Sequence, residues 1–467
     1  DLQLSEQQPR WEYFTKVWED QAGNVLLGYS PTPGDPYPLS GLYCVSTTGK
    51  NHPFREVLKV SDYIVSAYSQ DFFKNLILGI DTGLKIIQNR QFKIRKFLYE
   101  DVSSDKRGAV MRGITSNEAG EVYFAREVDA WYRFDPSTHQ LDTLLMVDEQ
   151  TGEAVELSCG RNLEMSADGY LWGLSCLNGQ NGRLLRYDPS TCMVRTYLFE
   201  HRFTAFTISK RSGLIWLVAE PNSPSGMLVS FDPESEQFEP LYDYEGKNPV
   251  SEASPRFILE ADNGILWIGT ENGLFFVNPD TRQSRSYRVS DNHSNGLASN
   301  VIYAIHEDEQ QRLWLGTTNG FHIFDPQENT WQHYNEEDGL AENTVCGFVP
   351  TRNGRYWVGT YNGISLFDPS QGTFRNYYRK DGFSNNEFNR FSYFSDRLGN
   401  IYFGGVNGMN VFRTVDLLVD IQTPAPVLTQ FSRYNKSLDT TILQISNLQA
   451  DAPIVIGPDD SQFTLSY

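Results

Sequence analysis

Arginines and asparagines recur at matched places along this chain, and their side chains are suited to holding a ligand. Arg112 and Arg256 each stand thirteen residues before the small residue that follows an apolar triplet, and Arg161 stands twelve before its own. The corresponding segments of later units contribute Asn300, Asn343, Asn386 and Arg390. Guanidinium forks and amides at these places would bind carboxylates or sugar hydroxyls. The alternative stays open that the asparagines cap turns and the arginines pair with neighbouring acids.

Catalytic and metal-binding patterns are lacking in the sequence. The seven histidines are scattered, without the close spacing of two metal ligands on one element. The aromatic residues Trp131, Tyr361 and Tyr378 are candidates to stack on sugar rings, although such residues also fill the gaps between packed sheets. We therefore predict no catalytic residue, no metal and no cofactor, and expect the chemistry of this chain to be binding.

A repeat supplies the scaffold for these residues. An apolar triplet followed by a small residue occurs nine times, with the small residue at positions 28, 79, 125, 173, 218, 269, 316, 359 and 404. The mean period of 47 residues fits a four-stranded propeller blade. The predicted fold class is all-β, a β-propeller of four-stranded blades. We favour one nine-bladed ring, because units outside a ring would leave an unpaired sheet edge; seven blades preceded by two extra units is the alternative.

Two short motifs predict where the strands of each unit end. Asn319-Gly320, with equivalents at 272, 362 and 407, predicts a type I′ hairpin turn because asparagine and glycine tolerate positive φ. Phe324-Asp325-Pro326 and the equivalent motifs in other units end the third strand, since proline lacks the N–H that a ladder needs. The last unit has no evident outer strand, and Leu2-Gln3-Leu4 is our candidate to close the ring.

Composition limits the partners. The net charge of −20 argues against nucleic acid, which needs a basic stripe. No apolar run reaches the 18 residues of a spanning helix. Five cysteines do not form an even disulfide framework, but hairpin register would set Cys159 opposite Cys176, so that the two are either bridged or free. The chain opens at Asp1 without a methionine, which suggests a processed protein or a fragment.

The repeat resembles a known family. Leu313-Trp314-Leu315-Gly316-Thr317, the Asn-Gly and Phe-Asp-Pro motifs after it, and Asp338-Gly339-Leu340 with Asn343 are similar to the two-component regulator propeller repeat of bacterial sensor proteins. The resemblance covers residues 15 to 412 and is strongest from 255 onward. It implies the extracytoplasmic sensor domain of a receptor of the (hybrid) sensor histidine kinase type. It also implies a periplasmic or extracellular location at the inner membrane, and an oligosaccharide or similar small polar ligand.

The sequence predicts three parts: a propeller over 1–412, a proline-stiffened linker over 413–426, and the opening strands of a truncated β-sandwich over 427–467. The resemblance identifies this tail with a tyrosine-rich sandwich, through which we expect a homodimer of the full-length protein. Membrane attachment would come only from segments outside this chain. Two other function classes stay open, a polysaccharide-active lyase or hydrolase and a protein-interaction propeller.

Overall fold

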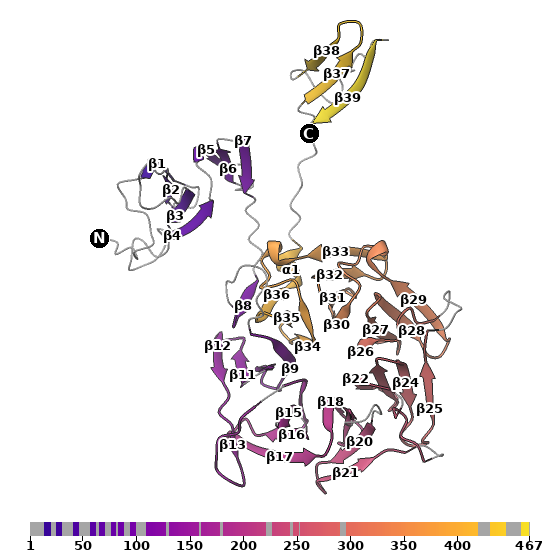
Figure 1. The fold of residues 1–467 in the computed structure, drawn as a ribbon. Coiled ribbons are helices and arrows are strands. Elements are labelled where there is room, and N and C mark those ends of the chain that lie inside the picture. The colour runs from indigo at the N-terminus through magenta and orange to yellow at the C-terminus, as the bar shows by residue number, and fades with distance from the viewer. Residues whose placement is uncertain are drawn as a thin grey trace. The chain divides into compact units, whose positions relative to one another are not determined.

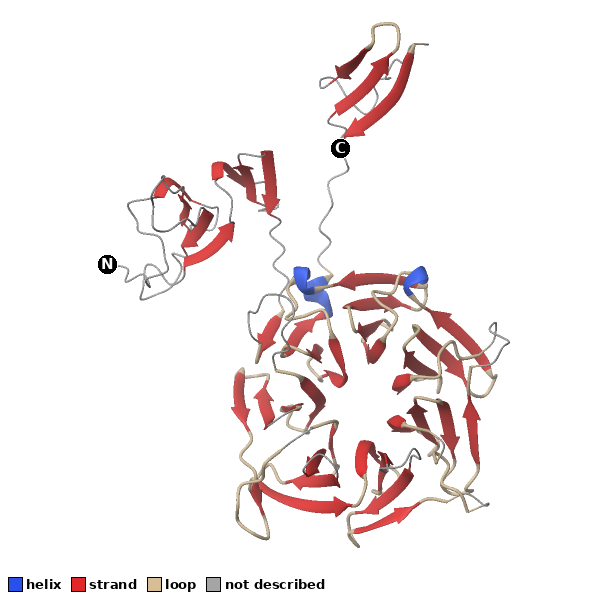
Figure 2. Ribbon diagram, in the orientation of Figure 1, coloured by secondary structure: helices blue, strands red, loops and turns tan. Residues whose placement is uncertain are grey.

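The computed structural model describes residues 94–99, 109–127, 130–157, 160–177, 181–220, 227–242, 246–251, 253–289, 296–418, 430–444 and 459–466, and seven strands before residue 88. The regular structure of this part of the chain is almost wholly β-strand, with one short α-helix, α1 (Thr414–Leu417), and two 3-10 turns, η2 (Glu336–Asp338) and η3 (Arg379–Asp381) (Figure 2). This described part contains no helix long and apolar enough to span a bilayer. The chain divides into two compact units, Asp1–Thr414 and Val415–Tyr467. The all-β prediction is confirmed.

Within the described residues, seven sheets surround a common centre, and each is a meander that runs outward from an innermost strand (Figure 1). Blades 1 to 7 are numbered by their inner strands: β9 (Met111–Ser116), β14 (Leu163–Met165), β18 (Arg202–Ile208), β22 (Pro255–Glu260), β26 (Ile302–Glu307), β30 (Val345–Pro350) and β34 (Phe388–Ser395). The second strands are β10 (Val122–Arg126), β15 (Leu171–Leu177), β19 (Ile215–Glu220), β23 (Leu266–Thr270), β27 (Leu313–Thr317), β31 (Tyr356–Thr360) and β35 (Asn400–Gly405).

Two further strands complete each blade. The third strands are β11 (Ala130–Asp135), β16 (Asn181–Tyr187), β20 (Met227–Asp232), β24 (Gly273–Val277), β28 (Phe321–Asp325), β32 (Gly363–Asp368) and β36 (Met409–Arg413). The outer strands are β12 (Gln140–Thr143), β17 (Met193–Phe199), β21 (Gln237–Pro240), β25 (Ser284–Tyr287), β29 (Thr330–Tyr334), β33 (Thr373–Tyr377) and β8 (Arg95–Phe97). Blade 2 also carries β13 (Val147–Asp148), which runs parallel to β17.

The outer strand of blade 7 comes from far upstream. β36 pairs with β8, with Asn410 opposite Lys96, and β34 packs directly against β9 of blade 1 (Figure 1). The described ring therefore closes after seven blades. The preferred nine-bladed ring is not confirmed, and the alternative with two preceding units fits these sheets. The closing strand is β8, which carries no repeat motif that would reveal it; Leu2–Leu4 lie outside the described residues.

Three sheets form outside the ring. The first two repeats give a four-stranded sheet, β1 (Phe14–Glu19), β2 (Val25–Tyr29), β3 (Gly41–Val45) and β4 (Val57–Ser61), and a three-stranded sheet, β5 (Val65–Gln70), β6 (Leu76–Ile80) and β7 (Gly83–Ile87). The second unit holds β37 (Gln430–Asn435), β38 (Thr440–Gln444) and β39 (Asp460–Ser466), with β37 in the middle. Helix α1 lies inside the stretch that the sequence predicts as an extended linker.

The hydrophobic core lies between neighbouring blades. Blade 5 contributes Trp314 and Phe321, and blade 6 contributes Phe348 and Phe367, to one shared cluster. Blades 2 to 6 each place a tryptophan as the second residue of their second strand, namely Trp172, Trp216, Trp267, Trp314 and Trp357, and none is more than 6% exposed. Because both faces of each sheet are covered, the second strands are continuously apolar.

The Asn-Gly hairpins differ from the predicted type I′ turn. The backbone N–H and the hydroxyl of Thr317 both donate to the carbonyl of Gly320, at 3.0 and 2.9 Å, and the N–H of Asn319 donates to Thr317 Oγ1 at 3.0 Å. Gly320 has φ of 76°, whereas Asn319 does not have positive φ. The loop is thus a two-residue turn followed by a left-handed glycine, because the threonine hydroxyl holds the asparagine N–H.

Candidate functional site

Five inner strands share a one-residue β-bulge close to their first residue. The ladder register slips there in β9, β18, β22, β26 and β30. The residues left out of the pairing are Gly113, Thr204, Arg256, Tyr303 and Cys346. A bulge re-aims the side chain that it frees. Since every blade repeats the same meander, the inner strands run in one direction and these positions gather at one end of the ring, which we call the axial end.

Five arginines lie at the axial end and form what we call the arginine cluster. Its members are Arg112 of β9, Arg161 just before β14, Arg202 of β18, Arg256 of β22 and Arg390 of β34. Burial, followed by the charges of the other arginines, lowers the pKa of Arg161 to about 9, so this side chain remains a cation at pH 7. The structure thus brings together all four arginines named from the sequence. It adds Arg202, which sequence reasoning missed because it stands at a different offset in its unit.

Two members of the cluster are paired with acids. Arg256 contacts Glu220 at 2.8 Å and its Nε donates to Glu271 at 2.9 Å, while Arg112 lies 3.3 Å from Glu127. No described carboxylate forms an ion pair with Arg161, Arg202 or Arg390. The open alternative from the sequence therefore applies to two of the arginines, and the other three need a different explanation. These three are the group we call the unpaired arginines.

Gly113 sets the spacing between the first two blades. It has φ of 68°, and a Cβ placed on it would lie 2.4 Å from the carbonyl oxygen of Arg161. Glycine is therefore required both for the left-handed backbone and for the close approach of the two chains. This contact brings β9 against the backbone of Arg161, and with it Arg112 and Arg161 into one group.

The bulge in β34 is longer than the others and reaches across the ring. Phe388 pairs with Gly405 and Tyr393 with Phe403, so the four residues 389–392 leave the ladder. The ring of Phe391, a residue with φ of 60°, stacks on Phe257 of blade 4 at 5.0 Å between centroids. The guanidinium of Arg390 lies 4.5 Å above the ring of Tyr303 in blade 5. Blade 7 thus contributes side chains to the opposite side of the axial end.

Two tyrosines stand beside the cluster. The rings of Tyr303 and Tyr361 are stacked with centroids 6.2 Å apart, and both side chains are only half-buried. Burial raises the pKa of Tyr361, so its phenol stays protonated at neutral pH. Trp131, by contrast, is 1% exposed and belongs to the core between blades 1 and 2. Tyr378 lies at the start of the 3-10 turn η3 (Arg379–Asp381).

The asparagines named from the sequence connect blades rather than join the cluster. The carbonyls of Asn300, Asn343 and Asn386 each accept the N–H of the hairpin glycine in the preceding blade. Their side-chain oxygens accept the backbone N–H groups of Val289, Glu336 and Arg379, at 2.7, 3.0 and 2.6 Å. Each side chain thereby orders the loop that leads into its inner strand.

Replacing Asn343 by alanine should destabilise the ring modestly. The variant would leave the N–H of Glu336 without its protein acceptor, and loss of such a cap costs about 1 kcal/mol. Urea unfolding measures this difference, and Asn343→Asp, which keeps the acceptor oxygen, serves as the control. Equal losses for Ala and Asp would show that the acceptor is not what matters.

The rest of the described residues offers little further chemistry. The described parts of the chain hold no group of three His, Cys, Asp or Glu side chains that could bind a metal ion. Cys346 and Cys192 are free thiols. Whether Cys159 and Cys176 are bridged or free stays open, because Cys159 lies outside the described residues.

Glu164 of β14 is a largely buried carboxylate close to Arg161 in sequence. It accepts the N–H of Ile208 in blade 3 at 2.8 Å, and burial raises its pKa from 4.5 to about 7. Because the folded pKa lies above the unfolded one, the unfolded chain ionises first, and this group lowers stability progressively between pH 4.5 and 7.

We expect Glu164→Gln to relieve that loss. Glutamine keeps an acceptor oxygen for Ile208 but carries no charge, so the variant should be more stable than the parent by roughly 1 to 3 kcal/mol above pH 7. The difference should shrink as the pH falls toward 4.5. Urea unfolding of both proteins across this range measures it, and a difference independent of pH would contradict the assignment.

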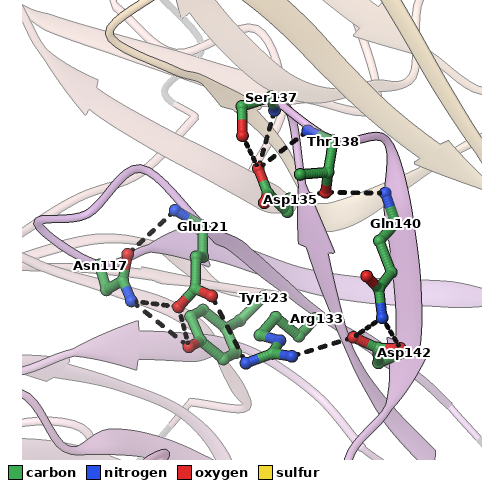
Figure 3. Close-up of polar contacts among 9 residues, drawn as sticks. All are labelled: Asn117, Glu121, Tyr123, Arg133, Asp135, Ser137, Thr138, Gln140 and Asp142. Carbon is green, nitrogen blue, oxygen red and sulfur yellow. Dashed lines mark hydrogen bonds and ion pairs between the residues drawn. The ribbon is translucent and has the colours of Figure 1, made fainter.

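A surface arginine shows what full pairing looks like in this fold. Arg133 of β11 contacts Asp142 at 3.0 Å and Glu121 at 3.4 Å, and Glu121 also accepts from Asn117 and Tyr123 (Figure 3). This network joins the strands of one blade and leaves the guanidinium compensated. It therefore supplies a matched comparison for the unpaired arginines.

Comparison with known proteins identifies the repeats. The family model of the two component regulator propeller matches residues 296–319 and 339–362. These two segments match the repeat of that family. Each runs from the glycine before the inner strand to the hairpin of the second and third strands, and so contains Asn300 or Asn343 but none of the clustered arginines. The matched segments thus cover blades 5 and 6, and the clustered arginines lie in the other blades.

One solved structure supports the propeller fold, and two others match less well. The extracellular domain of a hybrid two component system from B. thetaiotaomicron gives a TM-score of 0.63 at 18% identity, over 92% of this chain and 56% of that domain. A second such domain from that organism gives 0.35 at 16% identity, over 87% and 58%. YCF48 from Cyanidioschyzon merolae gives 0.49 at 10% identity, over 68% and 99%. Only the first supports an argument, and it concerns the fold.

The propeller-repeat chain spans little more than half the length of both B. thetaiotaomicron domains. No curated protein sequence matches it.

Proposed function

We propose that this chain is the ligand-sensing part of an extracytoplasmic domain of a bacterial membrane-bound two-component receptor, on the periplasmic or extracellular side of the inner membrane. The propeller repeats and their family support the sensing role. One observation carries the binding role: five arginines and two tyrosines from different blades converge at the axial end. Propellers commonly bind ligands where inner-strand loops meet around the axis. The ligand we propose is an oligosaccharide or a similar small polar molecule.

The signal would travel as a shift between two arrangements of the receptor. A ligand changes such an equilibrium only by binding one arrangement more tightly. The bulge of β34 is a suitable element, because blade 7 contributes Arg390 to the cluster and is followed in the chain by α1 and the unit Val415–Tyr467. We propose that the receptor acts as a homodimer through the C-terminal sandwich and that a histidine kinase or another output module reads the change.

A polysaccharide lyase or hydrolase is the rival function. Arginines that neutralise an acidic sugar beside tyrosines are an arrangement that a lyase could also use. Proton abstraction by tyrosine, however, needs a phenolate near neutral pH, and burial raises rather than lowers the pKa of Tyr361. In the part of the chain that the structure describes, neither tyrosine forms a hydrogen bond or a ring contact with a histidine. We therefore favour binding without turnover.

Thermal unfolding against a panel of oligosaccharides tests the proposal. A ligand that binds only the folded chain raises the melting temperature by mass action. We expect at least one sugar class to raise it in the parent and in Arg133→Gln, but not in Arg161→Gln. Chromatography of the same samples checks for cleavage. Cleavage of the sugar would mean that the protein is an enzyme rather than a sensor. A rise in melting temperature that persists in Arg161→Gln would mean that the ligand binds elsewhere than at the axial end.

A further inference from the structure

The arginine cluster carries an excess of positive charge at one place in an acidic protein. Among the described residues, the five guanidinium groups form ion pairs with three carboxylates, those of Glu127, Glu220 and Glu271. Two of these acids share Arg256, so the excess resides on the unpaired arginines. The whole chain has a net charge of −20. The positive group is therefore local, and a compact anion suits it better than a long polyanion.

Polar atoms within the cluster are left without partners. The Nε atoms of Arg202 and Arg390 are buried and form no hydrogen bond, whereas that of Arg112 faces Glu127 at 3.3 Å. A buried donor without an acceptor is costly, and like charges held together add to that cost. The lowered pKa of Arg161 has both causes, burial first and then the neighbouring arginines. An oxyanion would relieve both, because it accepts several N–H donors and neutralises the repulsion.

Arg133 lies in a different environment from the unpaired arginines. Its guanidinium is matched by two carboxylates within one blade (Figure 3). The unpaired arginines come from blades 2, 3 and 7, and their shared surroundings arise only when the ring closes. Pairing with neighbouring acids thus accounts for Arg133, Arg112 and Arg256, and it does not account for the remaining three.

The two tyrosines beside the cluster indicate what kind of molecule bears the anionic group. Tyr303 and Tyr361 are stacked and half-exposed beside Arg390, and their phenols are hydrogen-bond donors and acceptors. Tyrosine rings pack well against the apolar faces of ring-shaped polar ligands. Cations next to such a surface match a molecule with a flat face, hydroxyl groups and an acidic substituent.

We propose that Arg161, Arg202 and Arg390 form a subsite for the acidic group of a sugar, with Tyr303 and Tyr361 beside its ring. The ligand class is an acidic oligosaccharide that bears a uronate carboxylate or a sulfate ester. This deepens the proposed function and rests on it. Carboxylate and sulfate present the same oxyanion chemistry to a guanidinium fork, so the experiment separates the two sources.

Isothermal titration of the whole chain with four probes tests the subsite. The probes are trigalacturonate, a sulfated galactose trisaccharide, neutral galactotriose and inorganic sulfate. We expect at least one acidic trisaccharide to bind tenfold or more tightly than galactotriose and than sulfate. Arg161→Gln and Arg390→Gln should each weaken that binding at least tenfold, whereas Arg133→Gln should leave it unchanged.

The variants also report on their own folding. Removing an uncompensated cation should leave the melting temperature of unliganded Arg161→Gln equal to or higher than that of the parent, so lost binding cannot be attributed to unfolding. A lower melting temperature would mean that Arg161 stabilises the apo fold, and would contradict the unpaired state on which the subsite rests.

Three results would overturn the proposal. Equal affinity for galactotriose and trigalacturonate would remove the acidic requirement while leaving a sugar sensor intact. Binding of sulfate without either acidic trisaccharide would mean an ion site that does not recognise sugars. No binding of any probe at millimolar concentration would reject the acidic-sugar class, and the broader panel of neutral and polar ligands would then decide the sensor function separately.

Discussion

Replacing Trp314 by alanine should lower the free energy of unfolding by about 3 to 5 kcal/mol, the usual range for removing a large aromatic side chain from a core. The indole is fully buried and stacks on Tyr356 of blade 6 at 3.9 Å between ring centroids. Its Nε1 donates to Asp308 at 3.0 Å. Alanine would therefore open a cavity between blades 5 and 6 and remove a donor from a buried carboxylate.

Two control variants separate these effects of Trp314. Trp314→Phe keeps most of the packing but lacks the N–H, so it should cost about 1 to 2 kcal/mol. Leu398→Ala changes a side chain that is 68% exposed and should stay within about 0.5 kcal/mol of the parent. Guanidinium unfolding monitored by tryptophan fluorescence and circular dichroism measures all three. A loss below about 1 kcal/mol for the alanine variant would mean that the interface between blades 5 and 6 repacks.

Much of this scaffold could be predicted from the sequence because each blade repeats it. Trp314 and its equivalents in blades 2 to 6 occupy one position of the second strand, and in blades 4 to 6 the hairpin glycine stands three residues after a threonine. The type I′ turn was wrong in detail, since the hydroxyl of Thr317 holds the N–H of Asn319 and leaves only Gly320 with positive φ. A single-residue propensity does not include that side-chain bond.

Blade number was harder to predict, because repeat counting cannot tell which units share a ring. The ring closes where β34 meets β9, and β8 completes the last sheet. Neither the contact of β34 with β9 nor the pairing of β8 with β36 is marked by a sequence motif. Three residues that pair with a strand more than three hundred positions away contain no periodic signal, so only the three-dimensional structure could identify the closing strand.

The candidate binding residues named from the sequence divide into arginines, which form the cluster, and asparagines, which connect blades. Matched offsets led to Arg112, Arg161 and Arg256, which meet at the axial end because equivalent positions of a ring must meet. The same argument led to the asparagines, whose offsets are matched for a structural reason, the connection between blades. Equal spacing therefore predicts equal position but not equal role. The bulges and the missing partners, which separate the roles, are properties of the folded ring.

Disrupting β8 should have an effect as large as the loss of Trp314 and should also abolish ligand binding. We expect the combined change Arg95→Gly, Lys96→Pro and Phe97→Gly to cost about 3 to 5 kcal/mol. It removes three ladder pairs with β36 and the ring of Phe97, which lies 4.7 Å from Phe134 of blade 1. The freed edge of β36 should also promote association between molecules. Urea unfolding and light scattering measure the two effects.

The expected loss of ligand binding follows from where the ring closes, between blades 7 and 1. Blade 7 contributes Arg390, and the side chain of Asn389 donates to the carbonyl of Met111 across the closure at 3.1 Å. When β8 no longer holds blades 7 and 1 together, the β34 bulge loses this support and the arginine cluster loses one of its unpaired members. Lys96→Ala, which keeps the strand, should bind ligand normally. A disrupted β8 that retained both full stability and binding would mean that the inner strands alone hold the ring closed.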